Sequence, residues 1–125
     1  MWPFFLLRKK RDMLHSESLK SYRDFQKVYT SGRSFANRYL VMYVVENNKD
    51  INRLGISVSK KVGNSVVRHR MCRLVRESYR LQEAVFNSGL DIVVVVRVSA
   101  KDCNYFEIEK ALLHLGKLHN IISKT

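Results

Sequence analysis

Residues 91–98, with the sequence DIVVVVRV, constrain the fold of this chain more than any other stretch. β-Branched residues fill it almost without interruption, which is typical of a central strand buried on both faces of a sheet. Residues 53–59 are predicted to form another strand, and a long helix separates the two. Asn64 is a suitable N-cap for this helix, which is expected to end near Phe86, before Asn87-Ser88-Gly89. The long helix therefore crosses back from one strand to a central one.

The remaining elements are predicted from capping residues and apolar periodicity. Ser21 and Asp24 fit a capping box at the start of a short helix, which Gly32 is placed to end. Residues 38–45 alternate as a strand, and residues 104–120 form a closing helix. One side of the strand carries Tyr39, Val41, Tyr43 and Val45, and the other carries Leu40, Met42 and Val44. The apolar stripe of the closing helix consists of Ile108, Ala111, Leu112, Leu115, Leu118 and Ile122.

Together these elements predict an α+β fold with a small mixed sheet. The chain has 125 residues and is most simply one domain, which we place at residues 19–125. Residues 1–18 are expected to be a flexible basic extension. Their apolar run is too short for a membrane span, which needs roughly 20 residues. The charges follow that run, whereas a signal peptide has the reverse order.

Positive charge is concentrated in the middle of the chain. The formal net charge is +12, and repulsion among these charges weakens the compact state. A charge of this size therefore usually indicates a polyanionic binding partner. Between Arg53 and Arg80, eight cations accompany one carboxylate, Glu77. On a helical wheel, the core side of the long helix carries Val67, Met71, Leu74, Val75, Leu81 and Val85. The opposite side carries His69, Arg73, Arg76 and Arg80, with Arg68 and Arg70 flanking the core side. A nucleic acid is the favoured partner, and an anionic membrane surface is the alternative.

The turn before the long helix adds two ammonium groups, from Lys60 and Lys61, at a helix N-terminus. Gly63 and Asn64 in this turn fit either a phosphate-binding site or an ordinary strand-to-helix turn. A nucleotide-binding P-loop is excluded, because Lys60 stands where that motif needs its second glycine after Gly55.

No motif in the chain predicts a protein-borne active site or a metal site. The carboxylates are scattered, and the four histidines show no recognisable nuclease pairing. His69 and Cys72 have a spacing that metal ligands use, but no second pair of ligands accompanies them. Cys72 and Cys103 are the only cysteines, which implies no disulfide framework and favours a reducing cytosol.

The stretch from Arg53 to Glu77, RLGISVSKKVGNSVVRHRMCRLVRE, resembles the signature of the bacterial ribonuclease P protein subunit. The similarity extends through FQKVY at residues 25–29, Gly32 and SFANR at residues 34–38, and covers roughly residues 19–120. The resemblance implies a cytoplasmic RNA-binding domain that pairs with ribonuclease P RNA, a catalytic RNA. That endoribonuclease removes the 5′ leader of precursor tRNA with Mg²⁺ held mainly by the RNA. The resemblance implies neither a membrane partner nor a small-molecule substrate.

The resemblance also refines the expected fold. It implies three helices and a small mixed sheet of four strands, as in domains of some ribosomal proteins and translation elongation factors. It further implies a left-handed β-α-β crossover, although the general handedness rule favours the right-handed form.

The site residues implied by the resemblance fall into two groups. The group expected to contact the catalytic RNA is Lys60, Lys61, Asn64, Arg68, His69, Arg70, Arg73 and Arg76. The group expected to bind the leader, in a cleft between the first helix and the sheet, is Phe25, Tyr29, Ser34, Tyr43 and Cys72. Aromatic side chains beside cations are suited to stacking on single-stranded bases, although Phe25 and Tyr29 also fit simple core packing. His69 replaces the asparagine of the family pattern, and Cys72 replaces a lysine, which removes a cation near the cleft.

Two other functions would also account for the basic helix. A ribosome-associated or chaperoning RNA-binding protein would use the same cations, but it gives no reason for an aromatic single-strand groove. A membrane-surface helix would bind anionic lipid instead.

Overall fold

The computed structural model describes residues 16–123 of the chain, and within them the three predicted helices are present. The helices are α2 (Tyr22–Ser31), α3 (Ser65–Leu81) and α4 (Tyr105–Leu118). The strands are β1 (Ser16–Ser18), β2 (Arg33–Ala36), β3 (Leu40–Glu46), β4 (Asn52–Val58) and β5 (Leu90–Val96). Short 3-10 turns at Glu83–Val85 and Val98–Ala100 flank β5.

These strands form one mixed sheet in the order β1-β4-β5-β3-β2. The β-branched strand β5 is central and almost entirely buried, as its sequence predicts. Its neighbour β4 is parallel to it and β3 is antiparallel. The expected β-α-β unit is therefore β4-α3-β5, and the hand of its crossover stays a prediction.

The sheet has five strands rather than the four that the resemblance implies. The two strands that the residue pattern alone did not predict are the outer ones, β1 and β2, which have only three and four residues. Neither strand has the alternating apolar sequence that predicts a half-buried strand, and β2 is exposed along its whole length. Ser16–Ser18 fall within the predicted basic extension, but they pair in parallel with the start of β4. Residues 1–15 of that extension lie outside the described residues.

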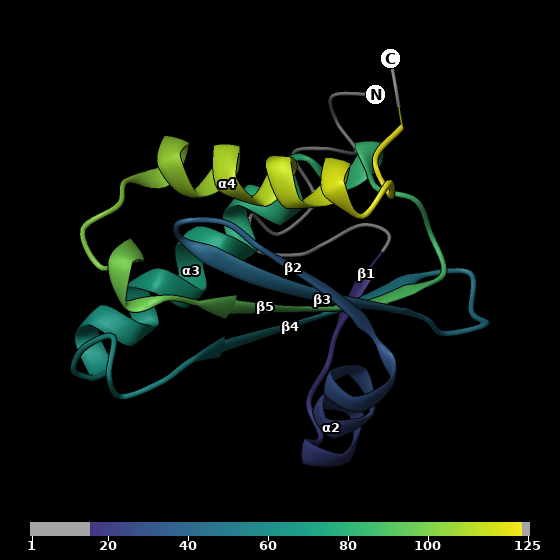
Figure 1. The fold of residues 1–125 in the computed structure, drawn as a ribbon, viewed down its shortest axis with the longest axis horizontal. Helices are drawn as coiled ribbons and strands as arrows, with labels where there is room; N and C mark the ends of the chain where they lie inside the picture. The colour runs from purple at the N-terminus through teal and green to yellow at the C-terminus, as the bar shows by residue number, and fades with distance from the viewer. Residues whose placement is uncertain (1–15, 124–125) are drawn as a thin grey trace, which may run out of the picture.

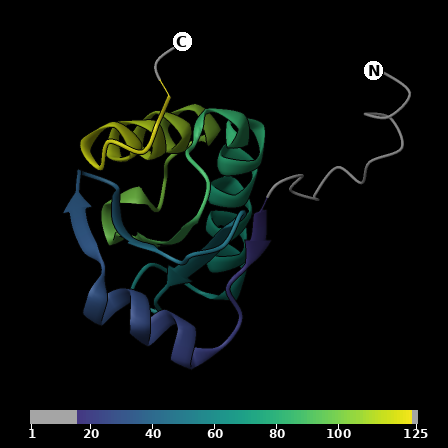
Figure 2. The same ribbon diagram turned by 90° about the vertical axis from the view of Figure 1, so that its right-hand side faces the viewer.

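Helices cover both faces of the sheet, as Figures 1 and 2 show, with α3 and α4 on one face and α2 on the other. The main core lies beneath α3 and α4 and includes Leu40 and Met42 of β3. A smaller cluster of Leu19, Val28 and Val93 lies beneath α2. The alternation predicted for β3 is confirmed, because its other side, with Tyr43 and Val45, packs against this smaller cluster.

The end of α3 differs from the prediction. The helix stops at Leu81, which is 56% exposed, instead of continuing to Phe86 with Leu81 in the core. Tyr79 is fully buried in its place, and its hydroxyl lies 2.8 Å from Ser16 Oγ and 3.1 Å from Asn52 Nδ2. The 3-10 turn after α3 redirects the chain, so that Phe86 packs beside Tyr79 with ring centroids 5.1 Å apart.

Candidate nucleic-acid interface

The start of α3 has the predicted cap and a tight turn before it. The Asn64 side chain accepts a hydrogen bond of 3.0 Å from the Val67 amide. Gly63 packs closely on the same residue, since an added Cβ would lie 2.8 Å from the Val67 Cβ. Lys60 and Lys61 in the turn are both exposed. The turn thus presents two ammonium groups beside a helix N-terminus, where anions are favoured.

Carboxylates neutralise only part of the positive charge around α3. Within residues 16–123, the ion pairs are those of Arg53 with Asp24 and Asp91, and of Arg80 with Glu77. Arg80 Nη2 lies 2.6 Å from Glu77 Oε1, so Arg80 is a neutralised cation rather than part of a free cationic side. The i, i+3 spacing of Glu77 and Arg80 in the sequence already indicated this ion pair.

Three arginines of α3 have neither a carboxylate partner nor a hydrogen bond to a backbone carbonyl in the described part of the chain. They are Arg68, Arg73 and Arg76, and we call them the guanidinium face. Arg73 is exposed and the other two are half-buried. His69 is exposed beside them. Guanidinium groups without internal acids are free to bind phosphates in bidentate geometry.

Arg70, which was predicted to join these arginines in binding RNA, is held by backbone carbonyls. Its guanidinium donates to the Lys101 carbonyl at 3.3 Å and to the Cys103 carbonyl at 2.8 Å. Both contacts attach α3 to the segment before α4. The charge of Arg70 stays uncompensated by these neutral acceptors, although part of its donor capacity is used.

A groove of about 450 Å³ separates α3 from β4. It is lined by Arg68, His69, Cys72 and Arg76, with Ile56 and Val58 of β4 as its apolar part. Burial raises the pKa of the Cys72 thiol, against the opposing effect of Arg76 and Arg68. The thiol is therefore neutral at pH 7, and the charge of the groove comes from its arginines.

The aromatic residues predicted to bind the leader come together on the other face of the sheet. The ring centroids of Phe25 and Tyr29 in α2 lie 6.4 Å apart, and those of Tyr29 and Tyr43 lie 4.9 Å apart, nearly perpendicular. All three side chains are half-buried against the small cluster beneath α2. Ser34 is exposed and faces Tyr43 across the β2–β3 pair. These rings thus combine core packing with an exposed edge.

Cys72, which was predicted to bind the leader, and Tyr39, which was predicted to share the side of Tyr43, both lie elsewhere. Cys72 lines the groove under α3, on the face of the sheet opposite to the leader cluster. Tyr39 precedes β3 and packs against the main core, so it does not share the side of Tyr43. Strand alternation does not extend to a turn residue, which is why the sequence pattern misplaced it.

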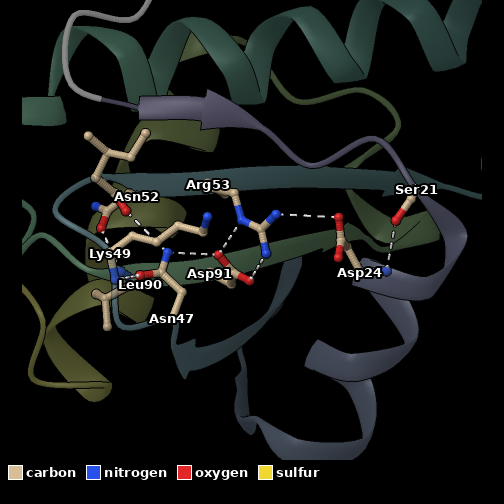
Figure 3. Close-up of polar contacts among 9 residues, drawn as sticks. Ser21, Asp24, Asn47, Lys49, Asn52, Arg53, Leu90 and Asp91 are labelled. Carbon is tan, nitrogen blue, oxygen red and sulfur yellow. Dashed lines mark hydrogen bonds and ion pairs between the residues drawn. The ribbon is translucent and has the colours of Figure 1, made fainter.

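The position of α2 is fixed by a polar network that Figure 3 shows. Arg53 on β4 donates to Asp91 on β5 through two bonds, of 2.9 and 2.6 Å, and lies 3.4 Å from Asp24 in the first turn of α2. Ser21 caps the helix by accepting from the Asp24 amide at 3.0 Å. Asn47 donates to Asp91 at 2.9 Å. Arg53 therefore serves the fold, although sequence counting placed it among the cations around α3.

Burial of Asp91 alone would raise the pKa of its carboxyl group. The hydrogen bonds from Arg53 and Asn47 outweigh this effect, so that the pKa of Asp91 lies below its ordinary value. Asp91 is 2% exposed and is ionised at neutral pH. The network is thus a buried ion pair between β4 and β5, which extends through Arg53 to the partly exposed Asp24 of α2.

Gly55 explains how closely α2 approaches the sheet. A Cβ at this position would lie 2.6 Å from the Phe25 ring, so only glycine allows the ring to rest on β4. Beyond Leu54, no described residue pairs with the outer edge of β4, because β1 is too short. This part of the edge, residues 55–58, lies between the groove under α3 and the aromatic cluster beneath α2.

The described residues do not offer a metal site of their own. No group of three or more His, Cys, Asp or Glu side chains in residues 16–123 is placed to hold an ion. A Mg²⁺ site built from protein carboxylates therefore does not fit this part of the chain. In the same residues, no helix has the length and apolar character needed to cross a membrane.

Comparisons with known proteins agree on one family. The family model described as Ribonuclease P matches residues 13–119. The ribonuclease P protein component of Lachnoclostridium phytofermentans is 66% identical over 110 residues, which are 88% of this chain and 95% of that protein. The component from Clostridioides difficile is 46% identical over 111 residues, covering 88% and 97% of the two chains.

Solved structures support the same assignment. The RNase P protein of Staphylococcus aureus superposes with a TM-score of 0.79 at 38% identity, over 85% of this chain and 97% of that one. The RNase P protein of Thermotoga maritima gives 0.75 at 33% identity, over 81% and 96% of the two chains. The resemblance seen in the sequence is thereby confirmed.

Proposed function

This chain belongs to the ribonuclease P protein family, and we propose that it binds the catalytic RNA through α3 and the 5′ leader of precursor tRNA through α2 and β3. As a ribonuclease P protein component, it is part of an endoribonuclease that matures the 5′ end of tRNA. The observation that carries the proposal is the guanidinium face of Arg68, Arg73 and Arg76, which lacks internal carboxylate partners within the described residues.

The RNA contact follows from the chemistry of α3. The guanidinium face supplies planar donors for phosphates and for exposed bases, and His69 adds a further hydrogen-bonding group beside it. Lys60, Lys61 and the N-terminus capped by Asn64 extend this surface into the preceding turn. Arg70 contributes charge from a position fixed by the Lys101 and Cys103 carbonyls.

Mg²⁺ enters the proposal as an ion held mainly by the RNA, because the described side chains form no suitable cluster. When bound there, it would supply charge neutralisation and an activated water for phosphodiester hydrolysis. The chain's own part is to bind and orient both RNAs. We place this activity in the cytoplasm, where the unpaired Cys72 and Cys103 fit a reducing environment.

The leader contact rests on the aromatic cluster of Phe25, Tyr29 and Tyr43. Stacking of a single-stranded base on such a ring contributes ~1–3 kcal/mol and tolerates any sequence. The exposed hydroxyl of Ser34 lies beside Tyr43 for a polar contact. Cys72 can meet the same strand only where the strand passes the open edge of β4, because its groove lies on the opposite face.

Reconstitution with a bacterial ribonuclease P RNA at low Mg²⁺ concentration tests the proposed function. We expect the protein to increase both cleavage of precursor tRNA and affinity for it, and we expect no cleavage by the protein alone. Unchanged cleavage and affinity would contradict the proposal. A general RNA chaperone would instead act equally on substrates with and without a leader, and a membrane-surface protein would bind anionic liposomes at physiological salt.

Replacing Phe25 and Tyr29 by alanine together should weaken binding of precursor tRNA to the reconstituted enzyme. The loss of one stacked base at ~1–3 kcal/mol corresponds to about a 5- to 150-fold change in Kd. Leaderless tRNA should be affected much less. Tyr22→Ala is the matched control, because Tyr22 is 80% exposed on the same helix and outside the aromatic cluster. Equal weakening of both substrates would assign the two rings to core packing alone.

A further inference from the structure

Cations outside α3 gather where α4 begins. Four exposed side chains contribute to this surface, which we call the end surface: Arg38, Arg97, Lys101 and Lys110. They come from the β2–β3 turn, the end of β5, the segment before α4, and α4 itself. Figure 1 shows the β2–β3 turn, the end of β5 and the beginning of α4 at the left end of the molecule, together with the start of α3.

Hydrogen bonds make the end surface continuous with α3. Arg70 of α3 donates to the Lys101 and Cys103 carbonyls, at 3.3 and 2.8 Å. Arg97 donates to the Asn37 carbonyl at 2.7 Å, and Asn37 Nδ2 donates to the Ala111 carbonyl of α4 at 2.9 Å. These hydrogen bonds hold the segments of the end surface in a fixed position beside α3. A rigid partner bound to α3 would therefore also contact the end surface.

A hollow of about 360 Å³ lies within the end surface, lined by Arg38, Tyr39, Lys110 and His114 among others. The Arg38 guanidinium carbon lies 5.3 Å from the centre of the Tyr39 ring, a cation–π contact that orients it. The amide of Asn37 donates to His114 Nδ1 at 3.1 Å, which leaves the other ring nitrogen as a donor. The hollow therefore combines two cations with a further donor and an aromatic ring.

One carboxylate lines this hollow; it keeps its charge, but its position is fixed by the backbone and it pairs with none of the four cations. Glu107 Oε1 accepts the Asn104 amide at 2.9 Å, as one half of the capping box of α4. No ion pair within residues 16–123 involves any of the four cations of the end surface. Their charge is thus free for an external anion, and their spread over several segments suits an extended polyanion rather than a single small ion.

We propose that the end surface is a second contact for the phosphate backbone of the catalytic RNA, beside the contact made by α3. The inference rests on the proposed function. The occupant is the catalytic RNA rather than the leader, because the aromatic leader cluster lies beneath α2, on the other face of the sheet. A large folded RNA bound along α3 reaches the end surface through the segment that Arg70 holds.

The test compares two charge reversals of equal size. Arg38→Glu with Lys110→Glu changes the end surface. Lys49→Glu with Lys117→Glu changes exposed lysines in the β3–β4 turn and in the last turn of α4, away from it. Dissociation constants for catalytic RNA alone are measured against salt. The end-surface variant should bind more weakly, and its log K against log[salt] slope should fall by about 1 for each phosphate that the protein no longer neutralises.

Each outcome has a distinct meaning. A slope equal to that of the Lys49/Lys117 variant would overturn the inference, as would a change seen only in precursor tRNA binding to the holoenzyme. Arg38→Gln with Lys110→Gln repeats the test without introduced acids, and circular dichroism confirms that the variants are folded. A third variant, Arg73→Gln with Arg76→Gln, tests the proposed RNA contact of α3 separately from that of the end surface. If it flattens the slope while the end-surface variants do not, only the further inference fails.

Discussion

Replacing Arg68, Arg73 and Arg76 by glutamine together should weaken binding of the catalytic RNA about a hundredfold or more at ~0.1 M salt. Each phosphate left without its arginine removes ~0.7–0.9 from the slope of log K against log[salt], and three such phosphates over one decade of salt give this factor. Arg70 is left in place, because its bonds to the Lys101 and Cys103 carbonyls also hold the segment before α4. Titrations of labelled RNA at several salt concentrations measure both the affinity and the slope.

Arg80→Gln is the matched control for this variant. Arg80 stands on the same helix, but Glu77 already neutralises it at 2.6 Å. We therefore expect its removal to leave the salt slope nearly unchanged. If the triple variant and Arg80→Gln gave the same slope, the guanidinium face would not be the RNA contact.

The fold was predictable from sequence where one local pattern determines one element. The β-branched run of β5, the Asn64 cap and the stripe of α4 each identify an element without knowledge of distant residues. Only Leu118 of that stripe is wrong, because it lies in the last turn of the helix and is 43% exposed. The outer strands β1 and β2 were not predictable in this way. They are short and lack an apolar alternation, so that their place in the sheet depends on partners far away in the sequence.

The candidate site shows the same division. The cationic side of α3 follows from helical periodicity, and its free arginines lie where that periodicity placed them. Whether a cation is free, however, depends on contacts that spacing does not reveal. Arg53 is paired with Asp91, 38 positions later, and Arg70 reaches carbonyls more than 30 positions away. The end surface is likewise assembled from four segments of the chain, so no local sequence motif predicts it.

Replacing Arg53 by methionine should lower the free energy of unfolding by about 3–5 kcal/mol at pH 7, the usual cost of leaving a buried charge without its partner. The side chain of Asp91 is 3% exposed, and in the variant it would keep only the hydrogen bond from Asn47 and the weaker attraction of Lys27. Urea denaturation followed by circular dichroism measures the destabilisation. Asp24→Asn is the control, because Asp24 is 32% exposed and 3.4 Å from Arg53, so that its replacement should cost within ~1 kcal/mol.

The stability difference caused by Arg53→Met should also depend on pH, with a sign set by Asp91. In the native protein the pKa of Asp91 is lowered, so its stabilising effect is complete above the ordinary carboxyl pKa of about 3.9 and is lost as the pH falls below it. In the variant, burial without Arg53 favours the protonated form, and acid removes the penalty. The difference between the two proteins should therefore narrow from pH 7 towards pH ~3. A difference that stayed constant over this range would show that poorer packing, rather than the unpaired Asp91 carboxylate, destabilises the variant.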